Sequence, residues 1–152
     1  MHYQNKIASI LFFAVGGFCS AAMKNPQQNS PEREKIRAYV SSLKLKKDSY
    51  RRARGGSAAI YEITCAKCNA VTMYYQKDGA GKLLRCYLDR IMYPESLERL
   101  AEIRTKKDMP NLVCSACTQL IGIPMVYTKD HENRLAFRMI YGCFSTNTIK
   151  GE

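Results

Sequence analysis

From residue 58 onward, short apolar stretches rich in β-branched and aromatic residues alternate with polar, glycine-containing stretches. This pattern is typical of antiparallel strands joined by turns. Within the third apolar stretch, Leu84, Cys86 and Leu88 stand two positions apart, so we expect them on one face of a strand. The loop at 77–82 contains two glycines and predicts a hairpin turn. The strands predicted in this way cover residues 58–64, 70–76, 83–93, 120–128 and 134–142.

Two segments instead have the spacing of amphipathic helices. In the first, Ser30 and Pro31 are suited to the cap and the first position of a helix. Four apolar residues then recur at helical spacing and form one stripe: Ile36, Tyr39, Val40 and Leu43. The second helix is predicted over 95–107, after Pro94. We expect the first helix to lie on the body of the protein.

The first 22 residues form a separate apolar segment that resembles a secretory signal peptide. A run of 12 apolar or small residues is followed by Ser20 and Ala22 at the positions that a signal peptidase reads. A membrane-spanning helix needs about 20 apolar residues, so no transmembrane span is expected after processing. An uncleaved anchor, or a true start at Met23, are the alternatives. The signal predicts export to the periplasm, whereas a start at Met23 predicts a cytoplasmic protein.

The net charge of +11 is concentrated near the N-terminus. Residues 24–54 contain ten Lys and Arg residues against three acids, whereas 55–152 contain thirteen against ten. Such a segment attracts phosphate backbones or anionic lipid surfaces, and a solvated, solubilising segment is the alternative. The candidate nucleic-acid-binding residues are Lys44, Lys46, Lys47, Arg51, Arg52 and Arg54.

Four cysteines carry the clearest chemical signal. They form two CxxC pairs, Cys65 with Cys68 and Cys114 with Cys117, separated by 45 residues. Each pair follows one predicted strand and precedes another. Zn²⁺ takes four thiolates in a tetrahedron, and two CxxC turns supply that number. The pattern therefore predicts one structural zinc site.

Two other thiol chemistries remain open. A redox-active CxxC usually begins a helix, but both pairs here lead into β-rich segments. Disulfides would be favoured if the chain is exported. Of the other cysteines, Cys86 is expected in the core, and Cys143 as a spare thiol or replacement ligand.

No catalytic arrangement stands out in the sequence. It has no HExxH motif and no pattern typical of a Ser-His-Asp triad or of paired catalytic carboxylates. His131 lies in a polar loop and is expected to be an exposed turn residue. Tyrosines interleaved with basic residues over 73–90 suit base stacking, although half-buried sheet tyrosines are the preferred interpretation. No small-molecule substrate is identifiable.

The stretches CAKC (65–68), YQKDGAGKLLRCYLDRI (75–91), VCSACTQLIGIPMVY (113–127) and RLAFRMIYG (134–142) resemble small bacterial zinc-ribbon-like proteins of uncharacterised function. The double CxxC spacing also resembles the β-tent group of zinc-binding domains. The resemblance implies a Cys₄ zinc site at Cys65, Cys68, Cys114 and Cys117, and no activity.

These observations predict a small β-rich α+β protein. Its zinc-ribbon-like body of antiparallel hairpins carries one inserted helix and an N-terminal helical arm. The predicted divisions are an apolar segment (1–22), a basic linker and short helix (23–57), a zinc-ribbon-like domain (58–146) and a tail (147–152). The predicted function is binding of nucleic acid or an acidic protein, with zinc as a structural cofactor. The alternative is an exported thiol protein with disulfide-bonded or redox-active CxxC pairs.

Overall fold

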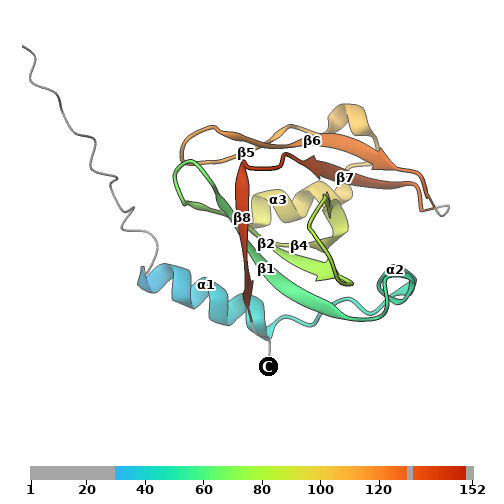
Figure 1. The fold of residues 1–152 in the computed structure, drawn as a ribbon, viewed down its shortest axis with the longest axis horizontal. Coiled ribbons are helices and arrows are strands. Elements are labelled where there is room, and N and C mark those ends of the chain that lie inside the picture. The colour runs from blue at the N-terminus through green and yellow to red at the C-terminus, as the bar shows by residue number, and fades with distance from the viewer. Residues whose placement is uncertain (1–29, 130–131, 150–152) are drawn as a thin grey trace, which may run out of the picture.

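Antiparallel strands form two four-stranded sheets in the computed structural model, which describes residues 30–129 and 132–149 (Figure 1). The first sheet has the order β4 (Ile91–Tyr93), β2 (Val71–Asp78), β1 (Ala58–Cys65), β8 (Phe144–Ile149). The second has the order β3 (Arg85–Tyr87), β7 (Arg134–Met139), β6 (Leu120–Tyr127), β5 (Leu112–Val113). The prediction of a small β-rich protein with antiparallel sheets is confirmed. The apolar segment 1–22, the linker up to residue 29 and His131 lie outside the described residues.

The main core contains residues of both sheets. Alternate positions on a strand face opposite sides of a sheet. Ile63 and Met73 of the first sheet therefore share one buried cluster with Ile121 and Phe137 of the second, and all four are fully buried. The hydrophobic effect thus favours the packing of the two sheets against each other.

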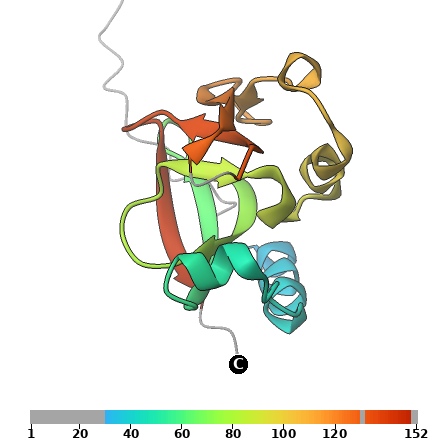
Figure 2. The same ribbon diagram turned by 90° about the vertical axis from the view of Figure 1, so that its right-hand side faces the viewer.

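Helix α1 (Pro31–Ser42) covers the other side of the first sheet (Figures 1 and 2). Its start is capped as predicted, because the Ser30 side chain accepts a hydrogen bond of 3.2 Å from the Arg33 amide. Val40 is fully buried in a second, smaller cluster with Ile60 and Tyr74. The prediction that this helix lies on the body is confirmed. None of the described helices is long and apolar enough to span a membrane.

The segment after α1 is also tied to the first sheet. The Lys46 amide donates to the Gln76 side-chain oxygen at 2.7 Å, and the Gln76 side-chain amide donates to the Lys46 carbonyl at 2.9 Å. The short helix α2 (Ser49–Ala53) follows, capped by Asp48. Residues 30–54 are therefore part of the folded domain.

The single strand predicted over 83–93 is wrong. A 3₁₀ helix at Leu88–Arg90 divides it into β3 and β4, which belong to different sheets. Tertiary contacts cause this division, because the Arg90 side chain in the 3₁₀ helix is buried and forms ion pairs with Asp48 and Asp78. Leu84, expected on one face with Cys86 and Leu88, precedes β3 and is 61% exposed, whereas the other two are buried.

The inserted helix is shorter than predicted. It consists of α3 (Glu95–Glu98), a 3₁₀ turn (Arg99–Glu102) and a separate 3₁₀ turn (Lys106–Asp108). Ile103 has an extended backbone and packs against the main core, which ends the helical stretch.

A strand that the sequence did not indicate follows the last predicted one. Residues 147–149, expected in a tail, are the end of β8. This strand pairs with β1 from Cys65 opposite Phe144 to Ile60 opposite Ile149.

Candidate metal centre

The four predicted cysteines converge at one point. The Sγ atoms of Cys65, Cys68, Cys114 and Cys117 all lie within 4.8 Å of one another. The Sγ atoms of Cys65 and Cys117 lie 3.6 Å apart, and those of Cys68 and Cys114 lie 3.5 Å apart. A tetrahedron with metal–sulfur bonds of about 2.3 Å has edges of about 3.8 Å, so the cluster has the dimensions of a Cys₄ site.

The first pair sits on a tight turn at the end of β1. The Cys65 amide donates to the Ala70 carbonyl at 2.9 Å, and the Asn69 amide donates to the Cys65 carbonyl at 2.9 Å. Asn69 has a φ of 59°, a left-handed conformation that Asn tolerates better than most residues. These bonds turn the chain so that both thiols face the same side.

The second pair repeats this turn before β6. The Cys114 amide donates to the Gln119 carbonyl and the Thr118 amide donates to the Cys114 carbonyl, both at 2.9 Å. Thr118 has a φ of 58°. Because Thr is β-branched, this left-handed backbone is strained, and the surrounding turn must hold it in place. The two turns are therefore equivalent in backbone geometry.

The thiols ionise unequally in the absence of a cation. Burial raises the pKa of Cys68 to about 12 and also raises the pKa of Cys114. A hydrogen bond from the Gln119 backbone amide lowers the pKa of Cys117 to about 7. Several thiolates this close repel one another, and a divalent cation reverses that repulsion. The donor set therefore fits a soft divalent metal.

The geometry differs from that of a disulfide or a redox pair. Bonded sulfurs lie about 2.05 Å apart, whereas all six described cysteines are free thiols. Two of the sulfur–sulfur contacts, at 3.6 and 3.5 Å, join one turn to the other. Neither pair begins a helix, because the turns lead into β2 and β6.

The two remaining described cysteines lie outside the cluster. Cys86 is fully buried, so its prediction as a core residue is confirmed. Cys143 is a neighbour of both turns: its carbonyl accepts from the Ala66 amide at 3.0 Å, and its Sγ lies 3.5 Å from the Gln119 side-chain nitrogen. It is not among the four clustered thiols.

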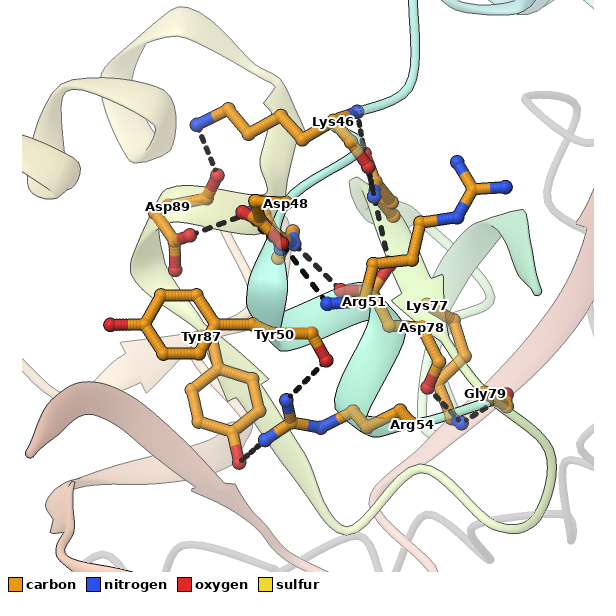
Figure 3. Close-up of polar contacts among 12 residues, drawn as sticks. Lys46, Asp48, Tyr50, Arg51, Arg54, Lys77, Asp78, Gly79, Tyr87 and Asp89 are labelled. Atoms are coloured by element: carbon orange, nitrogen blue, oxygen red, sulfur yellow. Dashed lines mark hydrogen bonds and ion pairs between the residues drawn. The ribbon is translucent and has the colours of Figure 1, made fainter. Parts of the chain in front are cut away.

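The candidate nucleic-acid-binding residues fall into two groups. Three have contacts within the protein (Figure 3). Arg54 binds Glu132 at 2.8 Å, the Lys46 ammonium donates to the Asp89 carbonyl at 2.7 Å, and the Arg51 Nε donates to the Gly56 carbonyl at 2.6 Å. The other three are exposed: Lys44, Lys47 and Arg52.

The tyrosines of the basic stretch belong mainly to the protein interior. Tyr74, Tyr75 and Tyr87 are 1%, 2% and 6% exposed, so their rings are not a stacking platform. They lie on β2 and β3, as the preferred interpretation expected, but they are buried rather than half-buried.

A buried carboxylate near α1 had no signal in the sequence. Glu62 is fully buried on β1 and binds Arg33 and Arg37 of α1 and the Tyr74 hydroxyl. Burial alone would raise its pKa, but the hydrogen bonds from these three side chains lower it to about 2. Arg33 and Arg37 stand four positions apart, which places them on one helix face, but this spacing is too common to be diagnostic.

Comparison with protein-family models, curated proteins and solved structures finds no match.

Proposed function

We propose that this chain is a binding module whose two sheets are joined by a structural zinc ion. The observation that supports this proposal is the convergence of four thiols, two from each CxxC turn, within 4.8 Å. Four thiolates are a soft ligand set that suits Zn²⁺, and a Cys₄ site leaves no open position for a substrate or water. The zinc would therefore stabilise the fold rather than act on a substrate.

Metal analysis tests this proposal. We expect one zinc per chain in protein purified without chelator. We also expect the four clustered thiols to react with Ellman's reagent only after the metal is removed, because metal coordination masks thiolates. Cys143→Ser is the matched control and should retain the metal. A metal-free protein with intact secondary structure would contradict the proposal.

An exported thiol protein is the second candidate. It is favoured by Cys117, whose side chain is partly exposed and whose pKa lies near 7, since such thiols react readily. Mass spectrometry of the mature N-terminus and of the thiol state distinguishes the two candidates. Cleavage after Ala22 together with disulfide-bonded cysteines would support this second function.

The proposed partner is the phosphate backbone of a nucleic acid. Lys44, Lys47 and Arg51 line one cavity of about 570 Å³ together with Ser41 and Ser42. No described carboxylate lies within ion-pair distance of these cations, and the Arg51 Nη1 atom is buried without a hydrogen-bond partner among the described residues. We call Lys44, Lys47, Arg51 and Arg52 the basic face.

Point variants test this partner better than deletion of residues 24–54, because Val40 in that segment is fully buried. The triple variant Lys44→Gln, Lys47→Gln, Arg52→Gln should bind a single-stranded oligonucleotide more weakly. Each lost phosphate contact reduces the magnitude of the slope of log affinity against log salt concentration by about 0.7. Lys106→Gln with Lys107→Gln is the control, away from the basic face. Equal slopes for the unchanged protein, the triple variant and the control would contradict nucleic-acid binding by this face. Binding of an acidic peptide more tightly than the oligonucleotide would indicate a protein partner.

A further inference from the structure

A second cavity lies beneath the loop that joins β2 to β3. Its volume is about 430 Å³, within the range of about 300–1,000 Å³ that small-ligand sites occupy. Its charged lining consists of four cations and one acid: Arg54, Lys77, Lys82, Arg85 and Asp78. The remaining walls include Tyr75, Tyr87 and Leu84. The cavity therefore combines positive charge with an apolar surface.

The acids of this region are already bound to arginines. Each forms an ion pair with a nitrogen–oxygen distance between 2.6 and 2.8 Å, and Figure 3 shows part of this network. The pairs are Asp48–Arg90, Asp78–Arg90, Asp89–Arg134 and Glu132–Arg54. Among the described residues, no carboxylate is left within ion-pair distance of Lys77, Lys82 or Arg85.

Lys77 places an ammonium group inside the loop. Its side chain is buried, and Nζ donates to the carbonyls of Asp78, Gly79 and Ala80 at 3.1, 2.8 and 3.2 Å. Figure 3 shows the contacts with Asp78 and Gly79. Carbonyl dipoles satisfy the three N–H groups, but they supply no opposite charge. Burial accordingly lowers the pKa of Lys77. An anion in the adjacent cavity would provide the missing countercharge.

Arg85 is held in position without an acidic partner. Its guanidinium lies over the Tyr127 ring, 4.4 Å from the centroid. A stacked guanidinium keeps N–H donors at its edge, and these suit phosphate or carboxylate oxygens. Lys82 is exposed on the same cavity lining. Leu84, 61% exposed, adds an apolar surface beside these cations.

We propose that the cavity lined by Lys77, Lys82, Leu84 and Arg85 binds a small organic anion that carries one phosphate or carboxylate group on an apolar body. The anionic group contacts Arg85 and Lys82 and neutralises the charge of Lys77. The apolar body rests against the exposed side chain of Leu84. This site is separate from the basic face, which shares none of its lining residues.

Titration of the full chain with phenyl phosphate, followed by amide NMR shifts, tests the proposal. We expect saturable one-to-one binding with the shifts concentrated in residues 77–87. Arg85→Gln and Lys82→Gln should each weaken the affinity about tenfold, the effect of one charged hydrogen bond. Lys107→Gln removes the same charge outside the cavity and should leave the affinity unchanged, as should Lys47→Gln on the basic face.

Benzoate and inorganic phosphate complete the test. Saturable binding of benzoate would identify a carboxylate ligand, and binding of phenyl phosphate alone would identify a phosphate ligand. Inorganic phosphate that binds as tightly as phenyl phosphate would overturn the apolar part of the proposal. Amide shifts that rise linearly with the concentration of both organic anions, without saturation, would overturn the site itself. Equal losses of affinity in Arg85→Gln and Lys107→Gln would overturn it as well.

Discussion

Replacement of Cys114 by serine should destabilise the whole domain, because Cys114 is a proposed metal ligand and is fully buried. A metal bound by both turns cross-links Cys68 and Cys114, which are 46 positions apart. A cross-link that closes a loop of this length lowers the conformational entropy of the unfolded chain, which raises the free energy of that state by about 4 kcal/mol at 25 °C. Domains of this size have a total stability of about 5–15 kcal/mol, so the loss is a large fraction of it.

Thermal unfolding followed by circular dichroism measures this effect. With zinc present, Cys114→Ser should melt about 12 °C below the unchanged protein, because 1 kcal/mol corresponds to roughly 3 °C at this chain length. A chelator should lower the Tm of the unchanged protein by a similar amount and have little effect on the variant. Cys143→Ser, next to the cluster but outside it, is the control and should melt like the unchanged protein.

The reasoning is refuted if Cys114→Ser and Cys143→Ser melt together, and if the chelator leaves both unchanged. That result would mean that the four thiols pack as ordinary buried side chains and that no metal contributes to stability.

Three further predictions concern other parts of the fold. Glu62→Gln should reduce the free energy of unfolding in urea by about 3 kcal/mol, since it leaves two arginines without their countercharge, whereas exposed Glu34→Gln should have little effect. Folding lowers the pKa of Glu62 to about 2, from about 4.3 in the unfolded chain. The ionised Glu62 side chain therefore stabilises the fold fully above a pH of about 4.3, and this stabilisation is lost as the pH falls toward about 2. The free energy of unfolding of Glu62→Gln should accordingly decrease less in acid than that of the unchanged protein. Gly79→Ala should lower the free energy of unfolding in urea more than Gly81→Ala does, by at least about 1 kcal/mol. Both glycines have a positive φ, but a Cβ at Gly79 would lie 2.5 Å from the Arg54 carbonyl oxygen, whereas a Cβ at Gly81 meets nothing within 4 Å.

The cysteine cluster could be predicted because its signal is local. Each CxxC turn is specified by a few neighbouring residues, and the β-rich segments around it limit how the chain continues. The cap at Ser30 and the stripe that buries Val40 are local in the same way. These features were therefore accessible without knowledge of the tertiary structure.

The division between β3 and β4 depends on contacts across the fold. Both halves are apolar, and what separates them is the buried Arg90, held by Asp48 from 42 positions earlier. The polar side chains of β8 between Ser145 and Thr148 are exposed, so this strand lacks the alternation that marks the others. The ion pairs of Arg54, Arg90 and Arg134 near the cavity could not be predicted either, because most of the paired residues are distant in sequence.

The pairing of β8 with β1 has a consequence for the order of folding. Ile60 and Ile149 are neighbours in this ladder although 89 positions separate them, so the pairing has a high entropic barrier and forms late. Until it forms, one edge of β1 presents unpaired amides and carbonyls beside apolar side chains, which is a template for pairing with another chain. Cys65, at the end of β1, stands opposite Phe144, the first residue of β8. Metal capture by Cys65 would therefore fix the end of the ladder where β8 begins, and so would shorten the time for which this edge of β1 is open to another chain.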